Sequence, residues 1–281
     1  MMREILFFAF RNKKLRIGFS LVLFFLILAI IGPYISKYKD PLEYVGPGYQ
    51  PPSKDYWLGT TTFGQDVFTQ LVHGLRSSFF IGFFGGGLAT LIGLVVGFLA
   101  GYEGGLFDEV LMMITNILLV IPTLALLIIV ASYLPYRGIF IESVIIGLTA
   151  WPWTARAVRA QTLSLKAREY VNLARITGRS HLKIILYEIM PNMMSYVFMV
   201  FILQFGGAIL AAVGLDFIGL GPTKGISIGL MLQNAVLWNA IQLGIWWWAI
   251  PPGLVITLIV GALYFMNTGL DEVFNPRLRE M

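Results

Sequence analysis

Few side chains in this sequence are of the types that perform covalent or metal chemistry. The 281 residues include no cysteine and only two histidines, His73 and His181, far apart in the chain. A thiolate site, a disulfide framework and a histidine-based metal centre are therefore not expected. No stretch has the spacing of a phosphate-binding P-loop, and the G-x-S-x-G and H-E-x-x-H motifs are missing. We expect a chain that is not an enzyme and binds no metal and no cofactor.

Side chains that can act through contact and charge are concentrated in residues 164–192, called the coupling segment below. It is the most charged part of a chain that is 57% hydrophobic and 12% charged. Its spacing predicts two short helices, with Gly178 ending the first and Ser180 capping the second. Residues at helical spacing, which we expect to share a face, are Tyr170, Leu173, Ala174 and Thr177, and then Leu182, Ile185, Leu186 and Ile189.

Two interpretations of this segment remain open from spacing alone. A basic, amphipathic helical hairpin between apolar runs could dock a partner at the membrane surface. It could equally be an ordinary interfacial loop whose lysines and arginines only follow the positive-inside rule.

The remainder of the chain predicts an all-α, polytopic helical membrane protein, because several apolar runs approach the ~20 residues that cross a bilayer. The six expected transmembrane helices are 17–35, 79–101, 110–133, 139–153, 193–214 and 246–269. Residues 1–16 are expected to be a cytoplasmic N-terminus, 36–77 an external loop and 78–281 the core. A secretory signal is the alternative for the N-terminus, but no cleavage-site pattern follows it. Lysine and arginine gather in 1–16, in the coupling segment and in the tail, which places both termini in the cytoplasm.

Three local features of the expected spans make further predictions. Gly93, Gly97 and Gly101 recur at intervals of four, which permits close helix approach, either within the chain or against a partner. Pro122 should kink the third span because it removes a backbone donor. Glu142 lies near the outer end of the fourth span, where we expect a hydrated rim residue.

Residues 172–191 resemble the cytoplasmic EAA loop of ABC-transporter permeases. That pattern reads E-A-A, three residues, Gly, nine residues and I-x-L-P. Asn172, Leu173 and Ala174 occupy the E-A-A positions, Gly178 follows, and residues 188–191 take the I-x-L-P positions with Pro191 at the end. Asn172, Leu173 and Glu188 depart from the pattern, so the details of docking can differ while the spacing is kept. The flanking residues are similar to the dipeptide/oligopeptide branch of the family.

Three further segments are similar to peptide-type permeases of this family. In residues 51–78 the matching positions include Leu58, Gly59 and Asp66. In residues 215–232 they include Phe217, Gly219 and Gly221. The tail 269–281 resembles the family ending G-L-R-D-A-L-D-P-R-L-R.

The resemblance implies the permease subunit of a type I ABC importer of the dipeptide/oligopeptide type. Expected partners are a homologous second permease, two ATP-binding subunits that use ATP and Mg, an external solute-binding protein and the lipid bilayer, with no nucleic acid. Residues implied in ATPase-subunit coupling are Glu169, Tyr170, Asn172, Leu173, Ala174, Arg175, Thr177, Gly178 and Pro191. Residues implied in external docking or gating are Leu58, Gly59, Asp66, Phe217, Gly219 and Gly221.

The location implied is a prokaryotic inner or plasma membrane. Oligosaccharides or nickel are alternative substrates for the same machinery. A self-contained secondary transporter or channel is the alternative class, for which we expect an inverted repeat or intramembrane ionisable residues.

Overall fold

A computed structural model describes residues 12–274, and within that range it contains ten α-helices and no β-strand. Most of the N-terminal segment 1–16, including its Arg3 and Arg11, and residues 275–281 of the tail lie outside the described residues, so the expectations for them stay predictions. The helices are α2 (Lys13–Ile35), α3 (Val67–Glu103), α4 (Gly105–Val120), α5 (Thr123–Ser132), α6 (Ile139–Lys166), α7 (Glu169–Ile176), α8 (His181–Ile184), α9 (Met194–Phe217), α10 (Ile228–Leu237) and α11 (Trp246–Phe274).

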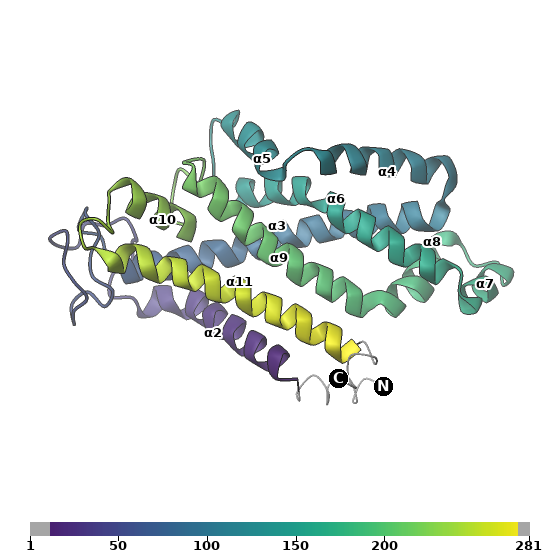
Figure 1. Cartoon of the computed structure of the whole chain (residues 1–281), viewed down its shortest axis with the longest axis horizontal. Helices are drawn as coiled ribbons and strands as arrows, with labels where there is room; N and C mark the ends of the chain where they lie inside the picture. Colours follow the sequence, from purple (N-terminus) through teal and green to yellow (C-terminus); the bar gives the residue numbers. More distant parts are fainter. Residues whose placement is uncertain (1–11, 275–281) are drawn as a thin grey trace.

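The long helices lie roughly along one axis and give the molecule two distinct ends (Figure 1). At one end, called the coupling end, lie α7 and α8. At the opposite end lie α10 and the long connection between α2 and α3. Helices α2 and α11 pack side by side, and α3 and α6 share the most extensive contact between any two helices.

Four helical stretches are long and apolar enough to cross a membrane: Lys13–Ile35, Val67–Glu103, His181–Phe217 and Trp246–Phe274. Helices α4 and α5 together make a fifth candidate, bent by 84° at the break between them. Helix α6 has 28 residues but carries Arg156, Arg159 and Lys166 in its second half, and it is not among these candidates. The chain is thus a polytopic helical membrane protein in which several helices extend beyond the apolar runs of the sequence.

Local chemistry explains where two of these helices begin and end. Asp66 caps α3, because its side chain accepts hydrogen bonds from the backbone N–H (2.8 Å) and hydroxyl (2.7 Å) of Thr69. This cap starts α3 at Val67, well before the expected start at 79. The third span is interrupted at Ile121, which has extended backbone angles, and Pro122 follows. The predicted kink at Pro122 is therefore a complete break of the helix.

Glycines at intervals of four on α3 allow its close contact with α6. A Cβ atom built on Gly93 would lie 2.4 Å from Cβ of Thr154, and one on Gly97 would lie 2.7 Å from Cβ of Val158. Real Cβ atoms do not approach so closely, so these positions require glycine at the present helix separation. The glycine stripe therefore packs within the chain.

Glu142 does not lie on a hydrated rim, and that expectation was wrong. Its side chain is only 4% exposed and faces Asp216 of α9, which is 1% exposed. Asp216 in turn accepts a hydrogen bond from the hydroxyl of Ser227, the cap of α10. Position along the helix suggested a rim residue, but packing of α9 against α6 covers this end of α6.

Candidate functional site

The coupling segment is a folded element that connects α6 to α9 (Figure 1). Helix α7 ends at the expected turn, where Gly178 has φ of 73°, a conformation that glycine adopts without steric cost. Ser180 precedes α8, but its side chain makes no capping hydrogen bond. After α8 the chain continues through a π-helical turn (Ile185–Ile189) and a 3₁₀ turn (Met190–Met193) that contains Pro191, and then enters α9.

One face of the segment is buried against the ends of α3 and α6. Val171, Ala174, Ile184, Ile185 and Ile189 pack in one cluster whose members also include Phe98 of α3 and Val158 of α6. This apolar contact holds the segment on the helix ends, so a displacement of α7 would be transmitted to α3 and α6.

The four residues predicted to share a face of α7 differ in burial. Ala174 is buried, but Leu173 is 63% exposed and Tyr170 is half-buried. Thr177 lies just after the helix and donates its hydroxyl hydrogen to the carbonyl oxygen of Ala174 (2.9 Å). The buried stripe is Val171 and Ala174, three residues apart, so Leu173 turns away from the core.

The second predicted face is likewise mixed in burial, because Leu182 and Leu186 are exposed whereas Ile185 and Ile189, together with Ile184, are buried. A π-helical turn begins at Ile185 and shifts the angular position of the residues that follow, which a regular 3.6-residue period does not describe.

The coupling segment therefore carries a set of exposed apolar side chains, and we call this set the outer patch. Ile176 is its most exposed member, at 82%. The members are Leu173, Ile176, Leu182, Leu186 and Tyr187. Of these, sequence reasoning placed only Leu173 in the site. Spacing alone could not separate the outer patch from the buried cluster, because both consist of apolar residues at helical intervals.

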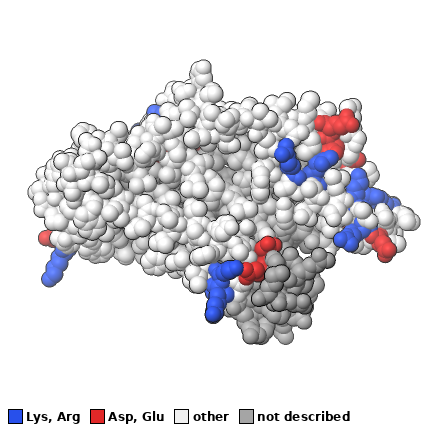
Figure 2. Space-filling view, in the orientation of Figure 1, with Lys and Arg blue, Asp and Glu red and all other residues white. Residues whose placement is uncertain are grey.

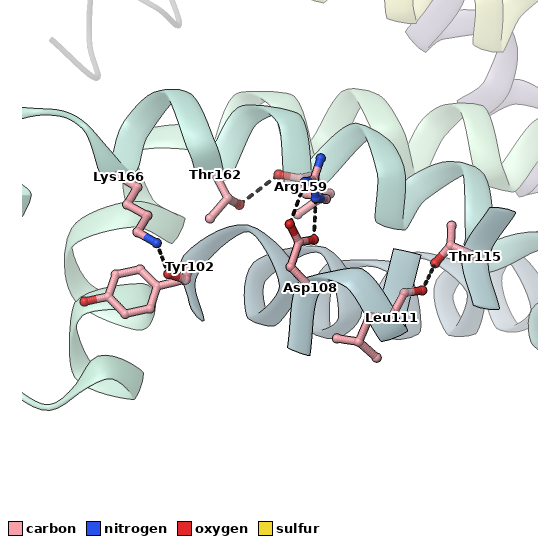
Figure 3. Close-up of polar contacts among 8 residues, drawn as sticks. Tyr102, Asp108, Leu111, Thr115, Arg159, Thr162 and Lys166 are labelled. Carbon is pink, nitrogen blue, oxygen red and sulfur yellow. Dashed lines mark hydrogen bonds and ion pairs between the residues drawn. The ribbon is translucent and has the colours of Figure 1, made fainter. Parts of the chain in front are cut away.

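Tyr102, near the end of α3, joins the coupling segment to the transmembrane helices. Lys166 donates a hydrogen bond to its carbonyl oxygen (Figure 3), and the guanidinium of Arg175 lies 5.3 Å from its ring centroid. The ring also meets His181 edge-on, with 5.3 Å between centroids. Beside it, Nδ1 of His181 lies 3.0 Å from a carboxylate oxygen of Glu103. Sequence reasoning missed Tyr102 and Glu103, which no motif singles out.

Charged side chains gather at the coupling end, whereas the middle of the visible face is almost free of them (Figure 2). Glu169 lies exposed in the first turn of α7, where a negative charge interacts favourably with the helix dipole. Arg175, in the last turn, donates a hydrogen bond to Oδ1 of Asn172 (3.2 Å). Arg179 forms an ion pair with Glu188. The coupling segment thus carries charged and polar side chains as well as the exposed apolar ones.

The other predicted site residues lie at the opposite end and have structural contacts. Gly59 has φ of 72°, and Leu58 is half-buried against the main hydrophobic cluster. Nε1 of Trp247 donates to the carbonyl oxygen of Thr60 (3.1 Å) and so fastens this connection to α11. A Cβ atom on Gly59 would lie 2.6 Å from that Nε1 atom. In the same connection, a hydrogen bond to Asp55 raises the pKa of Lys37.

The end of α9 and the turn after it hold the remaining three predicted residues. Phe217 is exposed, Gly219 has φ of 87°, and Gly221 leaves room for Asp216, whose Oδ1 would lie 2.4 Å from an added Cβ. Of these three, only Phe217 presents a side chain to the surroundings. The two glycines shape the turn around the buried Asp216.

A cavity of about 590 Å³ lies between α4, α5, α6 and α9, at the level of the Pro122 break. Leu118, Leu119, Thr149, Trp153 and Gln204 are among the described residues that line it, and none of that lining is charged. Gln204 is held in place because its Nε2 donates to the carbonyl oxygen of Ala150 (3.0 Å) and to the hydroxyl of Thr154 (2.6 Å). The cavity offers a few fixed polar groups in an apolar wall, which is typical of ligand sites.

Comparison with known proteins identifies the family of this chain. The model of one family, described as binding-protein-dependent transport system inner membrane component, matches residues 93–280. The matched region includes the coupling segment, the cavity helices and α11. The chain belongs to this family. As a member, it is a permease component of an ABC importer complex.

Similar proteins cover nearly the whole permease chain. The dipeptide transport system permease protein DppC of Bacillus subtilis (strain 168) is 33% identical over 270 residues, 96% of this chain and 83% of the relative. The oligopeptide transport system permease protein OppC of the same organism is 32% identical over 273 residues, 96% of this chain and 88% of the relative. DppC of Haemophilus influenzae is 29% identical over 289 residues, 99% of this chain and 96% of the relative.

Proposed function

We propose that this chain is one of two permease subunits in an ATP-driven importer of di- or oligopeptides in a prokaryotic inner or plasma membrane. A homologous permease, two ATP-binding subunits and an external solute-binding protein would complete the complex, and ATP and Mg would bind the ATP-binding subunits. This permease would bind no cofactor. Its spans would number six, with both termini in the cytoplasm. The names of the relatives, which are dipeptide and oligopeptide permeases, support the substrate class.

The observation that carries the proposal is the outer patch on a segment anchored to α3 and α6. Exposed apolar side chains on a segment that also carries charged and polar ones indicate a protein contact surface. In this proposal the patch contacts an ATP-binding subunit, while the buried face passes the motion of that subunit to the helices. Of the predicted coupling residues, Leu173 would contact the partner, Ala174 would hold α7 to the core, and Gly178 would shape the turn.

The cavity between α4, α5, α6 and α9 would form part of the translocation pathway. Since its described lining has no charged side chain, it would hold a peptide through Gln204, Thr149 and apolar contacts. Weak, uncharged contacts suit a pathway that releases its cargo, and they leave selection among peptides to the external binding protein.

The first test is affinity purification of the tagged chain from its native membrane in mild detergent, followed by identification of the co-purifying chains. We expect a second permease and P-loop ATPases. The substitution Leu173→Asp should abolish recovery of the ATPases, and Leu237→Asp, an exposed leucine on α10 at the opposite end, is the matched control. Normal recovery with Leu173→Asp would remove the outer patch from the interface.

Substrate class is tested separately with the external binding protein, by calorimetry against a set of di- and pentapeptides and a set of oligosaccharides. Peptide binding supports the proposal. Binding of sugars alone would support an importer whose substrate is an oligosaccharide instead of a peptide. Recovery of the chain without ATPases, together with ATP-independent transport in liposomes, would favour a secondary transporter.

A further inference from the structure

Two arginines on α6 reach across to α4 on the same side of the helix pair. Nε and Nη2 of Arg159 donate to Oδ1 (2.5 Å) and Oδ2 (2.6 Å) of Asp108, a two-pronged ion pair (Figure 3). Nη2 of Arg156 donates to Oδ1 of Asn116 (2.5 Å). Both arginines lie just before the coupling segment, where basic side chains are expected at the cytoplasmic surface. Instead their side chains are engaged between helices, and we call these two contacts the α4 clamp.

The Asp108–Arg159 pair has the geometry that makes such contacts strong. The planar guanidinium matches both carboxylate oxygens, which fixes the relative orientation of the two groups as well as their distance. The side chain of Asp108 is 14% exposed and that of Arg159 is 31% exposed, so water competes only in part. Removing one partner would leave a poorly solvated charge beside the other helix.

Apart from the clamp, α4 is weakly held. Within α4, all of which is described, Thr115 is the only buried residue, and its hydroxyl bonds to the helix itself, at the carbonyl oxygen of Leu111. Large apolar side chains such as Met113 and Val120 are exposed. Few apolar contacts therefore hold α4 in position, and the arginines of α6 supply the directional ones.

Both ends of α4 are joints at which the chain direction can change. At the coupling end, Gly104 and Gly105 have φ of 75° and 56°, and a Cβ on Gly105 would meet nothing within 4 Å. At the other end lies the 84° break at Ile121 and Pro122. A short rigid rod between two joints moves with whatever holds it along its length.

From these contacts we infer that Arg156 and Arg159 are positioning residues which make α4 follow α6 when the coupling segment moves. Helix α7 follows α6 after a two-residue turn, and α4 carries Leu118 and Leu119 in the cavity wall. Displacement of α7 by an ATP-binding subunit would shift α6, and the clamp would then shift one wall of the cavity. This inference rests on the proposed importer function and adds the route by which the cavity is opened and closed.

The functional test uses the complete complex reconstituted in liposomes, with ATP hydrolysis and peptide uptake measured on the same sample. Asp108→Asn keeps the size of the side chain but removes the ion pair, and Glu109→Gln, a neighbouring exposed carboxylate on α4, is the matched control. We expect Asp108→Asn to keep hydrolysing ATP while uptake per ATP falls at least about fivefold, as loss of a coupling contact would cause. Arg159→Lys should lie between wild type and Asp108→Asn because lysine cannot make the two-pronged contact.

Rescue separates a clamp from a general loss of structure. The exchanged pair Asp108→Arg with Arg159→Asp should recover uptake per ATP that either single change loses. Failure of Asp108→Asn to alter the ratio would overturn the inference, as would an exchanged pair no better than its singles.

A distance measurement tests the clamp without relying on transport. The chain has no cysteine, so spin labels can be placed at Met113→Cys on α4 and Leu163→Cys on α6, both at exposed positions. In the complex, the distance between the two labels should be the same in the nucleotide-free and vanadate-trapped states. The substitution Asp108→Asn should broaden the distribution of that distance. A distance distribution unchanged by Asp108→Asn would overturn the clamp. If the importer function itself were wrong, wild type would show no ATP-dependent uptake, yet the broadening by Asp108→Asn would still be seen in lipid alone.

Discussion

Replacement of Gly97 by alanine tests the packing of α3 on α6 directly. A Cβ atom at this position would lie 2.7 Å from the carbonyl oxygen of Ala155 and 2.7 Å from Cβ of Val158. Neither atom can rotate away, because one belongs to the α6 backbone and the other is fixed to it. The two helices must therefore separate locally. Gly87, on the same helix, is the matched control, since the nearest atom to its added Cβ is a ring carbon of Phe201 at 3.9 Å.

The expected change in the free energy of unfolding follows from two opposing effects. Alanine in place of glycine inside a helix stabilises by roughly 0.5–1 kcal/mol through backbone entropy. Overpacking of a close contact costs about 1–3 kcal/mol. Gly97→Ala should therefore lower the free energy of unfolding by about 0–2.5 kcal/mol, whereas Gly87→Ala should raise it by about 0.5–1 kcal/mol. The helix-propensity contribution is common to both variants, so the difference between them isolates the cost of packing.

Equilibrium unfolding in mixed micelles, followed by tryptophan fluorescence, measures this difference, and the chain has 7 tryptophans as reporters. If the Gly97→Ala variant is as stable as the Gly87→Ala variant or more stable, the glycine stripe does not serve the α3–α6 contact, and the reasoning is refuted. Loss of complex assembly with an unchanged unfolding free energy would point instead to a contact with a partner subunit.

Three further predictions concern the turn, the buried acids and the opposite end. Gly178→Val should leave the protein inserted and ATP hydrolysis intact but reduce uptake, because valine at φ of 73° costs ~1–2 kcal/mol of backbone strain in this turn; unchanged uptake would argue against a coupling role. Glu142→Gln should maintain or raise the melting temperature, since it removes one of two buried acidic side chains that face each other, and a clear fall would contradict the burial of this pair. Trp247→Phe should speed proteolysis of residues 36–66, because the carbonyl of Thr60 loses its donor at a cost of about 1–3 kcal/mol; Trp246→Phe, at an exposed ring, is the control and should cleave at the wild-type rate.

Several features of the fold could be predicted because their causes are local. The turn at Gly178 and the break at Pro122 follow from backbone geometry that a single residue imposes wherever it stands. That the chain is a helical membrane protein follows from the length of its apolar runs, which depends only on neighbouring residues in the chain. The position of the coupling segment was likewise readable, because its charge interrupts those runs.

Which side of each helix is buried depended on the tertiary structure. Leu173 and Ala174 are adjacent and both apolar, yet one is exposed and the other packs beneath α7, since α3 and α6 lie on only one side of it. Glu142 was expected at a wet rim, but α9 brings Asp216 against it.

The partners of the charged side chains were also beyond the sequence. Arg159 and Asp108 lie far apart in the chain and meet only because α4 turns back along α6. The sequence alone determined that this protein is a helical membrane chain with a charged, amphipathic segment between its apolar runs, because hydropathy and backbone preference act between neighbouring residues. Only the tertiary structure decided which residues are exposed, which face the core and which tie one helix to another, because burial and charge pairing arise from segments that folding brings together.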